Sequence, residues 1–118
     1  SLYSYIKNNK LESKGNSITE GIGTGRITKN FEKALIDDAF QTDDIEALNI
    51  VYDLIEKQNI ILGGSSGINI AGAIKLAKKL GKGKTIITIL CDDGRRYASK
   101  IFNKEFLKSK NLPIPNWL

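Results

Sequence analysis

At 118 residues and 13.0 kDa, the chain has room for one domain with one hydrophobic core, and its apolar fraction of 41% is sufficient to fill that core. No apolar run approaches the roughly 20 residues that span a bilayer, and the polar opening residues, SLYSYIK, do not form a secretory signal, so we expect a cytoplasmic protein with no membrane association. The net charge of +5 does not by itself indicate a nucleic-acid partner, because the lysines are dispersed and are not interleaved with aromatic residues.

The first forty residues are expected to contain a helix, a glycine-rich loop and a short strand. Residues 2–9 have helix-compatible spacing, although no capping residue precedes them. Residues 11–16 are polar and predict a surface connection. Residues 17–28 contain three glycines within five positions, which predicts a loop and not a regular element. The stretch 36–40 is compatible with a short strand.

An amphipathic helix is expected over residues 44–58. Thr42 or Asp43 is a candidate N-cap, and Glu46 follows Asp43 by three residues, as a capping box requires. Asn59 is the expected stop. The apolar residues that recur on one helical stripe are Ile45, Leu48, Val51, Tyr52 and Ile55.

The stretch 59–80, NIILGGSSGINIAGAIKLAKKL, predicts a strand, a glycine-rich turn and a helix in succession. The helix is expected from about residue 68 to residue 80, with Gly81 just past its end. Gly72 inside it indicates close packing, because glycine costs about 1 kcal/mol relative to alanine in a helix. The turn brings backbone N–H groups and hydroxyls together at a helix N-terminus, which favours an anion or a polar ring atom.

Residues 85–91, TIITILC, are rich in β-branched side chains and apolar on both faces, a pattern typical of a buried parallel strand. With the preceding strand and helix they predict a βαβ unit. The single cysteine, Cys91, closes this run, so a reduced and mostly buried thiol is expected. The turn 92–94 follows at the carboxyl end of the strand, where open α/β sheets place their ligand crevice.

The C-terminal residues predict one more short helix. Asn103 is expected to cap a helix over residues 104–109. Pro113 and Pro115 would end it and leave an extended tail at 116–118.

Two adjacent serines, Ser65 and Ser66, are the first candidates for chemistry. Ser65 lies beside glycines that allow a ligand to approach, so its hydroxyl could hydrogen-bond a ring nitrogen or a phosphate, whereas Ser66 is expected to cap the helix. The alternative is that both serines are only N-caps, which is common in βα turns and, on spacing alone, is the more frequent case.

Two further patterns carry little on their own. The run GIGTG at 21–25 lacks the Lys-Ser or Lys-Thr of a Walker motif and has neither the strand nor the helix of a dinucleotide fingerprint, so a structural turn is the simpler interpretation. Asp92 and Asp93 could form a carboxylate pair, but no histidine and no spaced third ligand accompanies them. A turn is therefore the default, and a metal site is not expected.

Taken together, three motifs are more informative. The segments EGIGTGRI at 20–27, LGGSSGIN at 62–69 and ILCDDGRRY at 89–97 resemble, in order and spacing, three motifs of one family. It is the cysteine synthase (O-acetylserine sulfhydrylase) and cystathionine β-synthase family of fold-type II pyridoxal 5'-phosphate (PLP) enzymes. The resemblance covers nearly the whole chain, and the tail 100–118 is similar to the bacterial cysteine synthase branch.

The resemblance implies an α/β fold like that of the tryptophan synthase β-chain, a three-layer αβα arrangement around a mostly parallel sheet. Residues 1–118 would form a single portion, the C-terminal part of the PLP-binding domain. The N-terminal part, with the lysine that holds the cofactor, the asparagine near its 3′-oxygen, the substrate-carboxylate loop and the phosphate loop, has no match in this chain. No catalytic residue is therefore assigned here.

Individual roles follow from the same resemblance. Ser65, with Gly64 beside it, matches the serine that hydrogen-bonds the pyridine nitrogen of PLP. Asp92 lies where the family places a residue behind the ring, although Cys91 before it departs from the usual proline. The residues that match the loop on the substrate side of the cofactor are Gly21, Ile22 and Gly23.

The implied activity is replacement of the β-substituent of O-acetylserine, or of a related activated serine, by sulfide or another thiol to make cysteine. The chain alone is expected to be inactive. The implied partners are the amino-acid substrate, the N-terminal part, a second copy in a dimer and a serine acetyltransferase. Two alternatives stay open: a truncated non-catalytic remnant or docking module, and a stand-alone α/β binder of phosphate ligands that uses the turn at 63–67.

Overall fold

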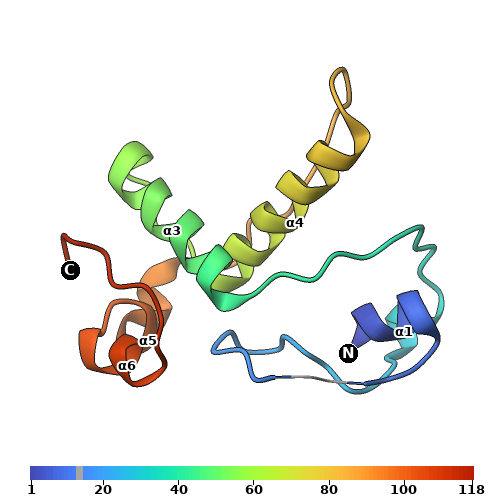
Figure 1. Ribbon diagram of the computed structural model, residues 1–118, viewed down its shortest axis with the longest axis horizontal. Helices are drawn as coiled ribbons and strands as arrows, with labels where there is room; N and C mark the ends of the chain where they lie inside the picture. The colour runs from blue at the N-terminus through green and yellow to red at the C-terminus, as the bar shows by residue number, and fades with distance from the viewer. Residues whose placement is uncertain (13–14) are drawn as a thin grey trace. The chain divides into compact units, whose positions relative to one another are not determined.

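The computed structural model describes residues 1–12 and 15–118, which form two compact units, 1–41 and 42–118. Each unit is described by itself (Figure 1). The expected surface connection at 11–16 includes residues 13–14, which lie outside the described residues. The described helices are α1 (Leu2–Asn8), α2 (Lys29–Glu32), α3 (Asp44–Gln58), α4 (Gly64–Leu80), the 3₁₀ turn η1 (Gly94–Tyr97), α5 (Ala98–Ile101) and α6 (Lys104–Ser109).

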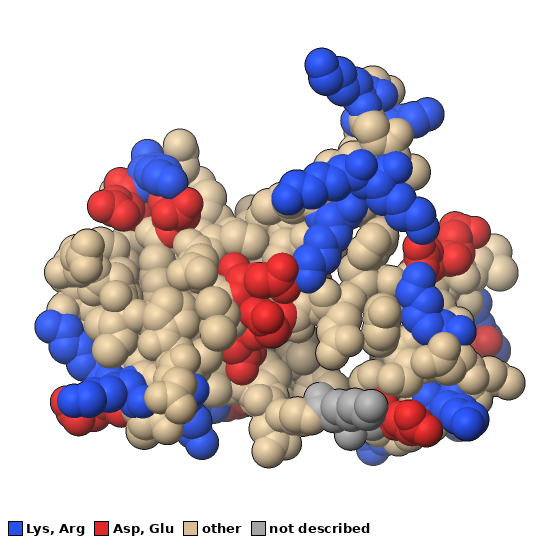
Figure 2. Space-filling model, viewed as in Figure 1, with Lys and Arg blue, Asp and Glu red and all other residues tan. Residues whose placement is uncertain are grey.

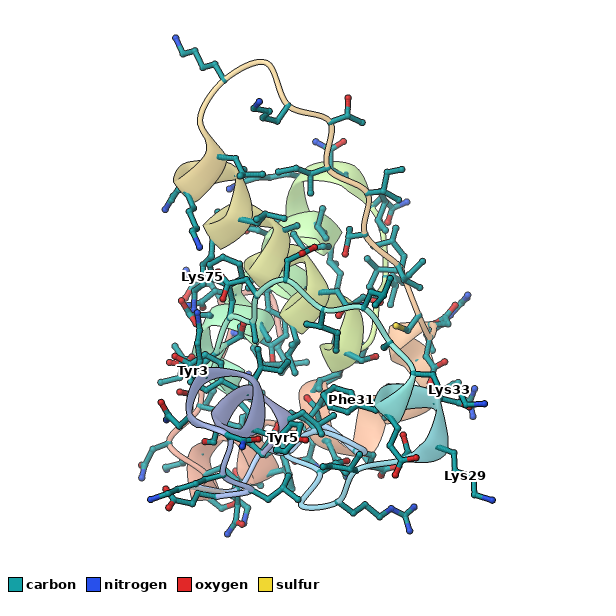
Figure 3. All side chains as sticks on the ribbon, turned by 90° about the vertical axis from the view of Figure 1, so that its right-hand side faces the viewer. Tyr3, Tyr5, Lys29, Phe31, Lys33 and Lys75 are labelled. Carbon is teal, nitrogen blue, oxygen red and sulfur yellow. The ribbon has the colours of Figure 1, made fainter. Side chains whose placement is uncertain are left out.

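The first unit confirms the helix expected near the start of the chain and adds a short one. Ser1 caps α1 by accepting from the Ser4 N–H at 3.3 Å, so the expectation that no capping residue precedes this helix is wrong. The four-residue α2 was not predicted either. Figure 3 shows Tyr5 of α1 and Phe31 of α2 close together, and their ring centroids lie 6.1 Å apart in an edge-to-face arrangement. This aromatic pair joins the two helices of the unit.

Helix α3 has the predicted bounds and the predicted caps. Asp43 accepts from the Glu46 N–H at 2.8 Å, and the Glu46 carboxylate accepts from the Asp43 N–H at 3.2 Å, which completes the capping box. Asn59 ends the helix in a left-handed conformation with φ of 56°. Leu48, Val51 and Tyr52 of the predicted stripe are buried, whereas Ile45 at the helix start is exposed.

Helix α4 begins four residues earlier than predicted, so the glycine-serine turn is itself the first helical turn. Gly63 is the N-cap, and no side chain caps the helix. The prediction that Ser66 caps α4 is therefore wrong, as is the alternative that both serines are only caps. Ser65 and Ser66 are already inside the helix, whereas a capping side chain stands at the N-cap and accepts from an N–H group two or three residues later.

Helices α3 and α4 meet near their N-terminal ends and diverge toward their C-terminal ends (Figure 1). Gly67 makes the close approach: a Cβ built on it would lie 2.4 Å from the Ala47 carbonyl oxygen. The expectation of close packing at Gly72 is wrong for the described chain, since a Cβ there meets nothing within 4 Å. The glycine that lets the two helices touch thus lies earlier on the helix than predicted.

The expected strands do not pair, so the described residues contain no β-sheet. The only bridge among them is an isolated antiparallel one between Leu62 and Asp93. Residues 85–91 make no backbone–backbone hydrogen bond to another described segment, and Ile87 is 86% exposed. This corrects the expectation of a buried strand within this chain. A strand is stabilised by neighbouring strands that take up its N–H and C=O groups, and the described part of the chain supplies no such neighbour.

The C-terminal segment folds back on α3. Asn103 caps α6 as predicted, by accepting from the Phe106 N–H at 3.1 Å. The expectation of an extended tail is wrong, because the Leu118 N–H donates to the Pro115 carbonyl and Trp117 packs edge-to-face on Tyr52 with centroids 5.8 Å apart. The buried apolar residues of the described chain are Ala47, Leu48, Val51, Tyr52, Ala71, Ile101 and Leu107.

None of the helices in the described ranges has both the length and the apolar character needed to span a bilayer.

Candidate functional site

The start of α4 and the turn at 91–94 are joined by three hydrogen bonds that involve the backbone, and we call this junction the seam. The Gly63 N–H donates to the Asp92 carbonyl at 2.9 Å, and the Gly94 N–H donates to the Ile61 carbonyl at 3.3 Å. The Cys91 N–H donates to the Ser66 hydroxyl oxygen at 2.8 Å. The seam therefore brings two of the three sequence motifs together in space.

Two glycines allow the seam to close. A Cβ on Gly94 would lie 2.5 Å from the Leu62 carbonyl oxygen, and a Cβ on Gly63 would lie 2.9 Å from the Tyr97 ring. Real Cβ contacts are essentially never this short, so glycine at position 94 lets the two backbones approach, and glycine at position 63 leaves room for the Tyr97 ring. The glycines of the second and third motifs thus have a local structural purpose.

The adjacent serines at the start of α4 have different surroundings. Ser66 is 0% exposed and is committed to the Cys91 N–H. Ser65 is half-buried, and within residues 1–12 and 15–118 its hydroxyl has no hydrogen-bond partner. No side chain caps α4, so the first-turn N–H groups of Gly64 and Ser65 have no side-chain acceptor among the described residues.

Asp92 is held by side chains of the third motif. The Tyr97 hydroxyl donates to the Asp92 carboxylate, and the Arg96 guanidinium lies 3.8 Å from the same carboxylate. The Tyr97 ring also covers Gly63, which places Tyr97 at the seam. Tyr97 was not singled out from the sequence, although its position five residues after Asp92 at the end of the third motif was a usable signal.

Asp93 has a turn-forming role, as the default interpretation predicted. It caps η1 by accepting from the Arg95 N–H at 2.9 Å, and its carboxylate also accepts from the Arg95 side chain. The hydrogen bond from the Arg95 guanidinium lowers the pKa of Asp93 to about 2. Asp93 is therefore ionised at neutral pH and engaged in the turn.

The thiol of Cys91 is exposed, so the expectation of a mostly buried cysteine is wrong for the described chain. Its sulfur lies 3.6 Å from the Asn69 side-chain nitrogen, which also donates to the Ile89 carbonyl at 2.9 Å. No role was predicted for Asn69. It lies three residues after Ser66, a spacing that puts both side chains on the face of α4 that holds segment 89–91.

The first motif belongs to the other compact unit. Gly21 and Gly23 have φ of +79° and +77°, which confirms that glycine shapes this loop. Ile22 between them is 43% exposed, and a Cβ on Gly21 would meet nothing within 4 Å. The loop thus presents a bare backbone and one exposed apolar side chain.

Positive charge gathers at the C-terminal end of α4. Figure 2 shows Lys and Arg side chains clustered over this end and the loop after it; its exposed members are Lys78, Lys79, Lys82 and Lys84. Lys75, earlier on the helix, pairs with Glu46 at 2.7 Å, and this hydrogen bond lowers the pKa of Glu46. Cations at a helix C-terminus complement the helix dipole, which accounts for the cluster.

The donor set beside Ser65 fits a neutral heteroatom of a ring. It consists of one hydroxyl with no partner among the described residues and backbone N–H groups that no side chain caps. Gly64 adds no side chain here, whereas the Tyr97 ring covers Gly63. No group of three or more metal-ligating side chains is found in the part of the chain that the structure describes. The chemistry available at this point is therefore hydrogen bonding to an acceptor.

The comparisons with known proteins agree with one another. Residues 1–92 match the family model described as "Pyridoxal-phosphate dependent enzyme". The chain is 43% identical over 98 residues to "Cysteine synthase" of Dictyostelium discoideum, covering 83% of this chain and 26% of that protein. It is 41% identical over 115 residues to "Cysteine synthase 1" of Neurospora crassa, covering 94% and 31%.

The chain also shares 35% identity over 98 residues with "Cystathionine beta-synthase" of Dictyostelium discoideum, covering 83% of this chain and 20% of that protein. It thus spans between a fifth and a third of the length of these relatives. The family model covers most of the chain, including the helices α3 and α4 and the seam up to Asp92. The chain belongs to the family of pyridoxal-phosphate dependent enzymes.

Proposed function

We propose that this chain is part of a cysteine synthase that replaces the β-substituent of O-acetylserine, or of a related activated serine, with sulfide or another thiol. The observation that carries the proposal is the unpaired Ser65 hydroxyl at the uncapped start of α4, next to the seam. The similarity to proteins named cysteine synthase at 41% and 43% identity supports this reaction over others of the family.

Ser65 would hold the pyridine nitrogen of PLP. When bound, PLP supplies electron withdrawal from the α-carbon of an amino-acid substrate. Ser65 offers a neutral hydroxyl and not a carboxylate, so it can hydrogen-bond the ring nitrogen without fixing a proton on it. This moderate withdrawal suits loss of a β-substituent, which does not need a long-lived carbanion. Gly64 beside Ser65 leaves the approach to the ring unobstructed.

Two further parts of the chain would line the site. The loop Gly21-Ile22-Gly23 would lie on the substrate side, where its bare backbone permits close approach. Asp92 would stand behind the ring, held by Tyr97 through the hydrogen bond described above. The covalent anchor for PLP, the phosphate loop and the substrate-carboxylate loop would come from the larger part of the enzyme that the relatives contain.

The larger part of the enzyme would also complete the sheet. Residues 85–91 have the composition of a buried parallel strand, yet Ile87, Ile89 and Leu90 are 86%, 67% and 53% exposed in this chain. We propose that they become a strand of a three-layer αβα fold once neighbouring strands pair with them. Dimerisation, docking of a serine acetyltransferase and a cytoplasmic location are proposed on the family resemblance.

The test is an assay of cysteine formation from O-acetylserine and sulfide, using the full-length polypeptide that carries this chain, with bound PLP. We expect Ser65→Ala to lower kcat about tenfold, the effect of one hydrogen bond, and Ser65→Thr to retain most of it because it keeps the hydroxyl. Turnover that is absent in the unaltered protein, or equal in Ser65→Ala, would contradict the proposal.

A second measurement asks whether this chain alone can bind PLP covalently. The purified chain 1–118 contains no match to the family's cofactor-binding lysine, so mixing it with PLP is expected to give neither a new visible absorbance band nor turnover. A new band would show that the covalent anchor had been wrongly assigned to another part of the enzyme.

A further inference from the structure

The two serines at the start of α4 differ in exposure, and the buried one, Ser66, is closed to any ligand. Ser66 is 0% exposed, so its hydroxyl is inaccessible to any molecule from outside. It is inside the helix and caps nothing, since the N-cap is Gly63. Its one polar contact that links distant parts of the chain is the 2.8 Å hydrogen bond from the Cys91 N–H.

This contact fixes the rotation of the first turn of α4. Successive residues in an α-helix are turned by about 100°. If Ser66 faces the turn 91–94, Ser65 is turned away from it, and the structure leaves Ser65 half-buried with a free hydroxyl. The direction in which Ser65 points is therefore coupled to the bond that Ser66 makes.

The other hydrogen bonds at the seam act at other positions. The Gly63 and Gly94 hydrogen bonds join backbone to backbone on the residues before α4, so they set the distance between the two segments. Asn69 reaches the same segment at the Ile89 carbonyl, one turn further along the helix. Among the described side chains of the first turn, Ser66 alone binds the segment that carries Asp92.

We propose that Ser66 is a positioning residue: by accepting the Cys91 N–H, it locks the first turn of α4 against the turn 91–94 and so aims the Ser65 hydroxyl at the cofactor ring. This inference rests on the proposed function, because it takes the ring nitrogen of PLP as the partner of Ser65. Ser66 itself touches neither cofactor nor substrate.

The test is a double-mutant cycle in the full-length, PLP-loaded protein. Ser66→Ala removes the acceptor, and Cys91→Pro removes the donor, because proline has no N–H. The readouts are the Kd for PLP and the ¹⁵N NMR signal of ring-labelled PLP. We expect each single change to weaken PLP binding about tenfold and to shift the ring-nitrogen signal in the direction that Ser65→Ala shifts it.

The double variant is the informative member of the cycle. If the two groups act through one bond, Ser66→Ala combined with Cys91→Pro weakens PLP binding no more than either change alone. A weakening of about a hundredfold, the product of two independent effects, would overturn the proposal. If one single variant fails to fold, the double variant remains a test, since it leaves no buried polar group without a partner.

Tyr52→Phe serves as the matched control for a purely structural role. It also removes a hydroxyl that bonds a distant backbone group, the Ile101 carbonyl at 2.7 Å. We expect it to lower Tm while leaving the ring-nitrogen signal unchanged. If Ser66→Ala behaves in the same way while Ser65→Ala shifts the signal, the positioning role is wrong. If Ser65→Ala itself leaves the signal unchanged, the proposed function fails at Ser65, and the positioning role fails with it.

Discussion

Gly67 of α4 lies against the backbone of Ala47 in α3, so close that a Cβ on Gly67 would stand 2.4 Å from the Ala47 carbonyl oxygen and 3.0 Å from a Val51 methyl group. Ala47 and Val51 are 1% and 0% exposed. The main helix–helix contact of the chain therefore depends on the absence of one side chain. Because the nearest atom belongs to a helical backbone, it cannot move aside as a flexible side chain could.

Replacing Gly67 by alanine is expected to destabilise the protein by about 1–3 kcal/mol, the usual cost of overpacking a core. The higher helix propensity of alanine, about 1 kcal/mol, offsets part of this cost. The measurement is urea unfolding followed by circular dichroism. Gly72→Ala is the matched control on the same helix: nothing lies within 4 Å of its Cβ, so it is expected to stabilise the chain by about 0.5–1 kcal/mol. Equal effects of the two changes would contradict the close contact at Gly67.

Removing the capping box of α3 is expected to weaken that helix. Asp43→Ala deletes the side-chain acceptor for the Glu46 N–H and should cost about 1 kcal/mol. Asp43→Ser, which keeps an acceptor at the N-cap, is expected to retain most of the stability. The midpoint of urea unfolding measures both. A Ser variant as unstable as the Ala variant would argue against the cap as the cause.

The indole of Trp117 is expected to hold the C-terminal residues on α3 and α5. It is 42% exposed, yet its ring packs on Tyr52 and on Phe102, with centroid distances of 5.8 and 6.3 Å. Trp117→Ala should cost about 1–2 kcal/mol, from the aromatic contacts and the area that they bury. Trp117→Phe should recover part of this loss.

Fluorescence gives an independent check, because Trp117 is the only tryptophan of the chain. Emission should shift to longer wavelength on unfolding, and quenching by acrylamide should increase at the same denaturant concentration. Quenching that is already complete in the folded protein would contradict the packed position of Trp117.

Tyr52 is expected to make stability depend on pH in the alkaline range. Its hydroxyl donates to the Ile101 carbonyl, and burial raises its pKa from 10.0 to about 12. A folded-state pKa above the unfolded one means that the folded state favours the neutral phenol. This contribution is complete below pH 10 and is lost as the pH rises from about 10 to about 12. Tyr52 therefore favours the folded state only while its hydroxyl keeps its proton.

The measurement is the free energy of unfolding between pH 8 and pH 12, in the unaltered protein and in Tyr52→Phe. Other tyrosines and the lysines also titrate in this range, so the quantity that matters is the difference between the two proteins. The unaltered protein should be more stable by about 1 kcal/mol below pH 10, from its hydrogen bond, and should lose that advantage above it. A difference that stays constant with pH would show that Tyr52 does not ionise on unfolding.

Much of the helical structure could be predicted from local sequence because its signals are local. Asp43, Glu46 and Asn59 specify the ends of α3 through side-chain caps and a left-handed stop, and Asn103 specifies the start of α6. The start of α4 was missed because GGSSG has the composition of a turn. In the structure this first turn packs through Gly67 on Ala47, 20 residues earlier in the chain, a contact that the local sequence does not show.

The candidate site was only partly predictable, because it too depends on contacts between residues that are distant along the chain. Three spaced motifs were enough to point to the family and to Ser65, and the family is confirmed by the match over residues 1–92. The different surroundings of Ser65 and Ser66 depend on Cys91, which lies 25 residues after Ser66, and the role of Tyr97 depends on its contact with Gly63. Contacts between residues so far apart in the chain produce no pattern in the local sequence, so they could not be predicted from it.

The sequence by itself determined the family, the ends of α3, the start of α6, and which serine is the candidate for the cofactor ring, because capping and motif spacing are properties of neighbouring residues. Tertiary structure decided that Ser66 is buried on the Cys91 N–H and that Trp117 folds back on Tyr52. It also decided that residues 85–91 make no backbone–backbone hydrogen bond to another described segment. Burial and strand pairing are contributed by partners that are distant along the chain, so only the assembled fold supplies them.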